Sequence, residues 1–388
     1  MTGLPPVIAL PASDDEVVNW VRELLARARA LGASDLHVDP GPDGACLRLR
    51  VHGLLRDWQD VPPRWLPRLV ARIKVMAGMD LAEKRLPQDG RLLDSHDPGG
   101  NIRVASLPTL HGEKLCLRLG DTGSAPGLAE LGLPEPVSSA LEQALARPDG
   151  LILITGPTGS GKTTTLYACL KQLNERSRHI ATVEDPIERA LPGISQTAIQ
   201  PRIGLDFASV LRALLRQDPD VLMVGEIRDC TTAEMAVAAA ETGHLVLSTL
   251  HTASALDALT RLRHLGVPAY LLADTIRLVV AQRLLRRLCR HCRQAFAPAS
   301  AEPSCPHCHE GYDGRTGLYE FMTMAPPLAS AWLSGADSQA LRRIAREQGW
   351  PTLADSAAEL LRQGLTSARE IRRVLGGSTP PTSAGESC

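Results

Sequence analysis

Residues 151–165 read LILITGPTGSGKTTT, and this stretch decides the class of fold. A short apolar strand enters a turn of the form Gly-x-x-x-x-Gly-Lys-Thr, and a helix follows at Leu166-Tyr167-Ala168. The backbone N–H groups of such a turn point at a phosphate chain, and the helix N-terminus adds a partial positive charge. Lys162 is expected to contact the β- and γ-phosphates, and the Thr163 hydroxyl to bind Mg²⁺. The residues predicted to bind a nucleoside triphosphate are Gly156, Pro157, Thr158, Gly159, Ser160, Gly161, Lys162, Thr163 and Thr164.

Composition places the chain among ordinary globular proteins. Its 388 residues are enough for two or three domains with sizeable cores. A formal net charge of −1 and an aromatic content of 3% argue against a nucleic-acid-binding protein. The first residues, MTGLPPVIALPASDDE, lack the basic and apolar regions of a secretory signal, and no stretch approaches the ~18 apolar residues that span a bilayer. We therefore expect a cytoplasmic protein.

The order of apolar and polar segments predicts two domains. Residues 1–119 read as a small α/β domain, and residues 120–127 are a polar, Gly/Pro-rich linker. Residues 128–375 form the second domain, in which strands alternate with helices before a helical subdomain at 328–375. Such alternation predicts an α/β fold with a parallel sheet covered on both faces. Residues 376–388 read as a disordered tail.

Carboxylates follow two further apolar strands of the second domain. Glu226 comes directly after the strand at 221–224, where a carboxylate can accept a proton from, or orient, the water that attacks the γ-phosphorus. Glu184, Asp185 and Glu188 crowd the end of the strand at 180–184. Their mutual repulsion favours a neighbouring Mg²⁺ or a water network, although an acidic turn ended by a proline is the alternative.

Two histidines bracket the next strand. His244 precedes the strand at 245–249 and His251 follows it. Both are expected to face the nucleotide, where they would hydrogen-bond the γ-phosphate and report its loss. The alternative is that they are structural, as isolated histidines more often are.

Four cysteines have the spacing of a metal site. Cys-x-x-Cys, twelve residues and a second Cys-x-x-Cys predict one tetrahedral zinc ion with a structural role, because all four positions would be filled. A redox pair or idle thiols are the alternative, and three histidines (His291, His307 and His309) lie among the ligands. The predicted zinc ligands are Cys289, Cys292, Cys305 and Cys308, within a segment at 286–311.

An ordered series of motifs carries a resemblance to a known family. Besides the phosphate loop, the motifs are LGASDLHVDP, EKRLPQDGR, NIRVASLPTLHGEKLCLRL, TVEDPIE, RQDPDVLMVGEIRD, TGHLVLSTLHT and GYDGRTGLYE. With them the chain resembles the ATPases that power type II secretion and type IV pilus assembly, a branch of the RecA-like hexameric motors. The resemblance implies a RecA-like P-loop domain with a parallel-rich sheet, preceded by a smaller PAS-like α/β domain.

The resemblance also assigns roles to single residues. It implies that residues 184–188 form the Asp box, that Glu226 closes the Walker B strand, and that His244 and His251 belong to the His box. Arginines are expected to act across a subunit boundary. The candidates are Arg85, Arg91 and Arg103 in the first domain, and Arg212 and Arg216 in the second.

The same resemblance implies partners and cofactors. It predicts a homo-hexamer that uses ATP, Mg²⁺ and Zn²⁺, lies peripherally at the inner membrane, and couples hydrolysis to interdomain motion at a platform protein. The tetracysteine segment favours the extension and secretion branch, and the residues before SDLHVDP leave room for a helix rather than a further N-terminal domain. A retraction or DNA-uptake motor and a non-hydrolysing regulatory subunit are the alternatives.

Overall fold

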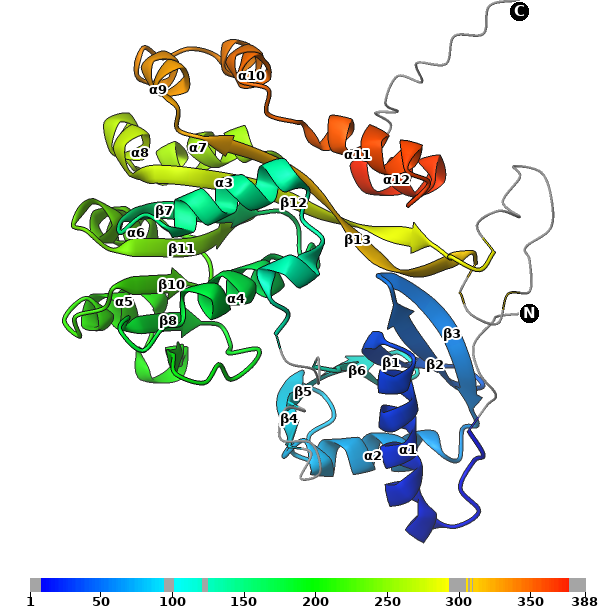
Figure 1. Cartoon of the computed structure of the whole chain (residues 1–388). Coiled ribbons are helices and arrows are strands. Elements are labelled where there is room, and N and C mark those ends of the chain that lie inside the picture. The colour runs from blue at the N-terminus through cyan, green and yellow to red at the C-terminus, as the bar shows by residue number, and fades with distance from the viewer. Residues whose placement is uncertain are drawn as a thin grey trace, which may run out of the picture. The chain divides into compact units, whose positions relative to one another are not determined.

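The computed structural model describes residues 8–93, 101–120, 125–292, 305, 308 and 310–376, and the chain divides into two compact units (Figure 1). The first unit comprises Met1–Ser124 and Cys289–Gly314, and the second comprises Ala125–Leu288 and Arg315–Cys388. From the sequence we expected residues 286–311 in the second domain, whereas most of this segment groups with the first unit. Residues 121–124 of the expected linker and 377–388 of the expected tail lie outside the described residues.

The first unit is built on a six-stranded sheet in which every neighbouring pair is antiparallel, in the order β3-β2-β1-β6-β5-β4. Its elements are η1 (Asp14–Glu16), α1 (Val17–Ala30), β1 (Ala33–Gly41), β2 (Gly44–Val51), β3 (Leu54–Val61), α2 (Leu66–Met76), β4 (Gln88–Leu93), β5 (Asn101–Thr109) and β6 (Gly112–Arg118). We did not predict β3 and β4 from the sequence. β3 lacks regular apolar alternation, and β4 carries Gly90 in a polar stretch.

The two faces of this sheet differ in chemistry. Leu36 and Val38 of β1 are buried in one apolar cluster with residues of α1 and α2. The residues that alternate with them along β1 are Asp35, His37 and Asp39. Their side chains point to the other face, because successive strand residues alternate. There Lys114 pairs with Asp39 at 2.7 Å, one of several ion pairs on this face. The small domain is thus the α/β module that the sequence indicates.

The second unit contains a seven-stranded sheet in the order β13-β12-β7-β11-β10-β8-β9. The pairs β12–β7, β7–β11, β11–β10, β10–β8 and β8–β9 are all parallel. Its strands are β7 (Gly150–Thr155), β8 (Ile180–Glu184), β9 (Ser195–Ala198), β10 (Val221–Val224), β11 (Leu245–Leu250), β12 (Ile276–Leu288) and β13 (Tyr312–Thr323). The expected α/β fold with a parallel-rich sheet is confirmed.

Helices cover both faces of this sheet (Figure 1). Leu151 and Leu153 of β7 belong to the core under α5 to α8, whereas Ile152 and Ile154 belong to the core under α3 and α4. A strand buried on both sides reads as a continuous apolar run, which is why residues 151–154 contain no polar side chain. The helices are η2 (Leu128–Leu131), α3 (Glu135–Leu145), α4 (Lys162–Leu173), η3 (Pro201–Ile203), α5 (Phe207–Leu214), α6 (Cys230–Glu241), α7 (Ala255–His264) and α8 (Ala269–Thr275).

Four more helices end the described chain: α9 (Pro326–Leu333), α10 (Ser338–Glu347), α11 (Leu353–Arg362) and α12 (Ala368–Leu375). A buried ion pair joins α12 to β12, since the Glu370 carboxylate accepts hydrogen bonds at 3.0 Å from the backbone N–H and Nε of Arg286. Arg373 donates to the same carboxylate at 2.8 Å. Among the described residues, no helix is both long and apolar enough to cross a membrane.

Candidate active site and metal centre

The phosphate loop lies where the sequence places it, between β7 and α4. Lys162 is the first residue of α4, and its Nζ donates to the carbonyls of Gly156 at 2.8 Å and Pro157 at 3.0 Å. Burial lowers the pKa of Lys162 to about 8, with Glu226 opposing the shift and Arg283 adding to it. The ammonium group therefore lies against the backbone of the loop, and its hydrogen-bond partners among the described residues are carbonyl oxygens.

Three glycines give the loop its shape. Gly156, Gly159 and Gly161 have φ angles of 150°, 78° and 89°, which residues other than glycine rarely adopt. A Cβ at Gly156 would lie 2.4 Å from the Gln282 carbonyl oxygen, so the backbone passes close to β12. In the described part of the chain, the Ser160 hydroxyl is buried without a hydrogen-bond partner. An unpaired donor inside a ring of backbone amides at a helix N-terminus fits a phosphate chain.

Gln282 and Arg283 of β12 complete the loop, and we missed both in the sequence. Gln282 Oε1 accepts a hydrogen bond from Thr165 of α4 at 2.8 Å. Arg283 Nη2 donates to the Ala253 carbonyl at 2.7 Å, and its Nη1 lies 3.1 Å from a Cβ built at Gly156. The available signal was the apolar run IRLVVAQRLL, which reads as a strand.

Glu226 is held at the carboxyl-end edge of the sheet by backbone hydrogen bonds on both sides. Gly225 N donates to the Val183 carbonyl of β8 at 2.8 Å, and Ile227 N donates to the Thr249 carbonyl of β11 at 3.1 Å. The side chain of Glu226 is 12% exposed and pairs with Arg228. A carboxylate fixed in this way and close enough to Lys162 to influence its pKa is suited to orienting a water molecule.

His251 lies beside this carboxylate. Its Nε2 is 3.6 Å from Glu226 Oε2. Burial first, and then the charge of Lys162, lower the pKa of His251 below its ordinary value. The imidazole is therefore neutral at pH 7 and presents one donor and one acceptor.

His244 corrects one expectation, because it lies at the opposite edge of the sheet. Its carbonyl accepts a hydrogen bond from Gly150, the first residue of β7, whereas the phosphate loop follows the last residue of β7. Its Nδ1 lies 2.9 Å from the Ala239 carbonyl of α6. Within one chain, therefore, His251 lies at the edge of the sheet that carries the phosphate loop and His244 does not.

Glu184 ends β8 and is buried, at 3% exposure. Its Oε1 accepts hydrogen bonds from Thr182 at 2.6 Å and Gln196 at 3.0 Å, and its Oε2 accepts one from the Tyr167 hydroxyl. Asp185 and Glu188 of the same acidic segment are exposed. Of the three neighbouring carboxylates, that of Glu184 is therefore buried and hydrogen-bonded, whereas those of Asp185 and Glu188 are exposed to solvent.

The two arginines of the second unit that the sequence singled out, Arg212 and Arg216, lie away from Lys162. Arg212 is exposed in the last turn of α5, and Arg216 comes just after the helix, donating to the Arg212 carbonyl at 2.9 Å. Because α5 leads into the amino end of β10, both lie toward the edge of the sheet opposite the phosphate loop.

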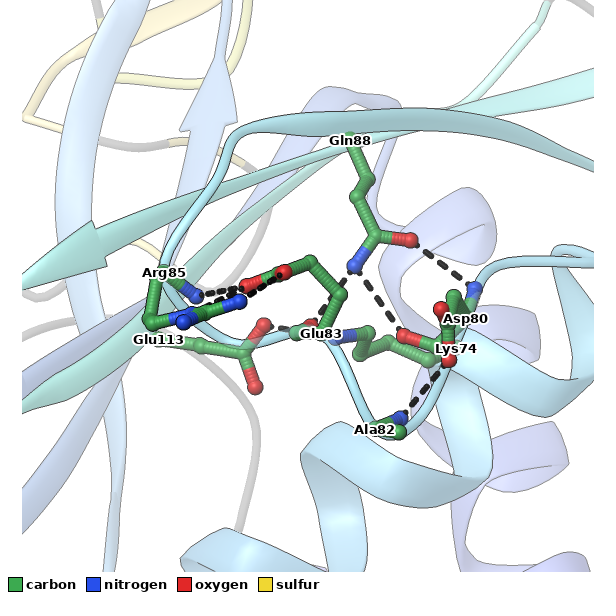
Figure 2. A network of polar contacts seen from close by, with 7 residues as sticks. All are labelled: Lys74, Asp80, Ala82, Glu83, Arg85, Gln88 and Glu113. Carbon is green, nitrogen blue, oxygen red and sulfur yellow. Dashed lines mark hydrogen bonds and ion pairs between the residues drawn. The ribbon is translucent and has the colours of Figure 1, made fainter.

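A buried polar network holds the segment that carries Arg85 (Figure 2). Lys74 of α2 is 1% exposed, and its Nζ donates at 2.7 Å both to Glu113 and to the Glu83 carbonyl. Gln88 donates to that same carbonyl at 2.8 Å. The Glu83 carboxylate pairs with the Arg85 guanidinium at 2.9 Å, while the Arg85 side chain stays 88% exposed. The backbone at Glu83 is thus fixed from inside the unit and presents Arg85 outward.

The other two candidate arginines of the first unit lie on adjacent strands. Arg91 of β4 and Arg103 of β5 are register partners in the antiparallel sheet.

The four cysteines come together as their spacing predicts. Their sulfur atoms all lie within 4.8 Å of one another. Cys289 and Cys305 are 4.0 Å apart, and Cys292 and Cys308 are 3.5 Å apart. Four thiolates at ~2.3 Å from one tetrahedral zinc ion are about 3.8 Å apart, so this donor set fits zinc. His307 and His309 lie outside the described residues.

Residues 11–373 match the family model described as Type II/IV secretion system protein. The chain belongs to this family. It is 44% identical to the type IV pilus assembly ATPase PilB of Acinetobacter baylyi, over 92% of this chain and 66% of that one. It is 43% identical to the type II secretion system ATPase E of Vibrio cholerae, over 94% of this chain and 76% of that one. Its fold matches that of the Legionella pneumophila ATPase DotB with a TM-score of 0.72, at 23% identity, over 95% of this chain and 97% of that one. The resemblance expected from the motifs is confirmed, and this secretion ATPase is an ATP hydrolase.

Proposed function

We propose that this chain is the motor subunit of a hexameric Mg-ATPase that extends a type IV pilus or a type II secretion pseudopilus. One observation carries the proposal: a single edge of the sheet gathers Lys162, Glu226 and His251, which come from segments after three different strands. This is the edge at which open α/β sheets bind ligands. The proposal rests further on family membership and on the relatives' roles in pilus assembly and secretion.

Each group at this edge has a task in phosphoryl transfer. The Lys162 ammonium exchanges its backbone carbonyl partners for phosphate oxygens, and Glu226 orients the attacking water. Neutral His251 hydrogen-bonds the γ-phosphate or the water beside Glu226. The Thr163 hydroxyl would hold Mg²⁺, and the bound ion would supply positive charge against the phosphates.

The assembly supplies the remaining positive charge. Arg85, Arg91 and Arg103 of the first unit, with Arg212 and Arg216 of the second, are the candidates to act across a subunit boundary. Turnover per subunit should therefore rise steeply with protein concentration as the ring forms. The cysteine cluster binds zinc as a structural ion, and the ring docks peripherally on an inner-membrane platform protein from the cytoplasmic side.

Glu226→Gln tests the chemical part of the proposal. The amide keeps the shape of the side chain but cannot accept a proton, so kcat should fall about 10²–10⁴-fold while ATP still binds. Phosphate release by the assembled protein measures turnover, and Glu234→Gln, on the exposed face of α6, is the matched control. Wild-type turnover in Glu226→Gln would show that this carboxylate has no part in hydrolysis.

A deletion strain tests the cellular part. Loss of filaments or of secretion is expected. A strain that still builds filaments but cannot withdraw them would identify a retraction motor instead.

A further inference from the structure

Tyr167 is a buried tyrosine on the helix of the phosphate loop. It lies four residues after Thr163 on α4, about one turn along the same side, and is 2% exposed. Its hydroxyl donates to Glu184 Oε2 and accepts a hydrogen bond from the backbone N–H of Glu188 at 3.2 Å. Burial, followed by the hydrogen bond and charge of Glu184, raises the pKa of Tyr167 well above its ordinary value, so the hydroxyl stays protonated.

The Glu184 carboxylate accepts most of its hydrogen bonds from within the fold. It can accept about four hydrogen bonds, and three come from Tyr167, Thr182 and Gln196. None of the ion pairs among the described residues involves Glu184, and its three hydrogen-bond donors are neutral side chains.

The hydrogen bonds around Glu184 also hold the acidic segment that follows β8. Gln196, on β9, donates to the Arg189 carbonyl at 2.9 Å and accepts from the Leu191 N–H at 2.7 Å. Together with the hydrogen bond from Glu188 N to Tyr167, these contacts tie residues 188–191 to α4 and β9 through Glu184. The exposed carboxylates of Asp185 and Glu188 are carried on this segment.

We propose that Glu184 and Tyr167 are positioning residues for ATP hydrolysis: their buried pair sets the acidic segment at 185–188 against the helix that begins with Lys162 and Thr163. Glu184 does not touch the reacting phosphate. Asp185 and Glu188, the exposed carboxylates of this segment, are then the ones that would contact Mg²⁺ or its waters. The inference rests on the proposed function, because it assumes that the nucleotide binds at the phosphate loop.

The consequence of breaking the pair follows from its geometry. Tyr167→Phe removes one donor from Glu184 and also removes the hydroxyl that accepts a hydrogen bond from the Glu188 N–H. Glu184→Gln places an amide N–H₂ against groups that donate to the carboxylate. Neither change touches the contacts of Lys162 with the loop. Removing partners that orient a reactive group typically costs about 10–100-fold in activity, and we expect this loss in kcat for either variant.

The test is a double-mutant cycle on the full chain, with Tyr167→Phe, Glu184→Gln and the double variant. If the two side chains act as one unit, kcat should fall 10–100-fold in each single variant and no further in the double variant. Affinity for a fluorescent ATP analogue should change less than about threefold, because the phosphate loop is intact. Tyr319→Phe is the matched control: Tyr319 is equally buried in the same apolar cluster, and none of the hydrogen bonds described for this unit involves its hydroxyl.

Two results would overturn the inference. The first is a loss above about 10³-fold in Glu184→Gln with near-normal turnover in Tyr167→Phe, which would make Glu184 a group that contacts the reacting atoms. The second is unchanged hydrogen exchange at the Glu188 amide in Tyr167→Phe relative to Tyr319→Phe. That measurement uses the nucleotide-free chain, so it judges the positioning pair even if the wild-type protein fails to hydrolyse ATP and the proposed function falls.

Discussion

The lowered pKa of Lys162 makes nucleotide affinity depend on pH in a defined direction. In the free protein burial lowers this pKa to about 8, and an anionic phosphate chain raises it again by favouring the charged form. A group whose pKa rises on binding supports binding fully below its free-state pKa and less as pH increases above it. ATP affinity should therefore be constant below about pH 7 and fall above pH 8.

The size of the effect follows from the fraction of charged lysine. With a pKa of about 8, roughly nine in ten chains carry the ammonium form at pH 7 and roughly one in ten at pH 9. The dissociation constant should rise about tenfold between these values, or about 1.4 kcal/mol of binding free energy. In the free protein His251 adds no charge change in this window, because its pKa is lowered below its ordinary value.

Calorimetry measures this linkage directly. Titration with a non-hydrolysable Mg-ATP analogue, in buffers of different ionisation enthalpy, gives the number of protons taken up on binding. We expect about 0.9 proton at pH 9 and about 0.1 at pH 7. Lys162→Met should bind weakly and without this uptake. No proton uptake at pH 9 in the wild-type protein would refute the assignment of Lys162 as a buried lysine that regains its charge on phosphate.

Two further predictions concern stability and the metal centre. Glu370→Gln leaves Arg286 buried without its carboxylate and should lower the free energy of unfolding by about 3–5 kcal/mol in denaturant titrations, whereas Glu359→Gln, in a partly exposed pair, should cost less than about 1 kcal/mol. Burial alone would raise the pKa of Glu370, but hydrogen bonds from arginines outweigh it and lower the pKa to about 2. The stabilisation by this ion pair should therefore be complete above about pH 4.3 and disappear as pH falls toward 2. An equal loss of unfolding free energy in both variants would contradict the role of the buried pair, and a stability that does not change in acid would contradict the pH dependence. Zinc analysis should find about one ion per chain, retained in Cys230→Ser and reduced in Cys305→Ser, and equal zinc content in the two variants would exclude the cysteine cluster as the site.

Local sequence was sufficient for the parts of the site that depend on local geometry. The phosphate loop was predicted residue by residue, because a strand, a glycine turn and a helix follow one another without interruption from residue 150 to residue 173. The cysteine cluster was predicted from spacing, since each Cys-x-x-Cys pair can offer two thiolates to one metal ion. The alternation of strands and helices was likewise enough to predict the α/β fold.

Local sequence patterns did not predict the contacts between segments that are distant in the chain. His244 and His251 looked equivalent in the sequence, yet they bracket one extended strand and so lie at opposite edges of the sheet. Gln282 and Arg283 reach the loop only because β12 pairs with β7 across more than a hundred residues.

The sequence by itself determined which chemistry this chain carries: a triphosphate loop, a glutamate after a buried strand, and four thiols spaced for one metal ion. Tertiary structure alone decided where the remaining polar residues lie, placing Arg283 at the loop and burying Glu184 against Tyr167. The physical reason is that a motif's conformation depends on its neighbours in the chain. A side chain's partners depend instead on strand order, which is set by burial of apolar surface over the whole domain.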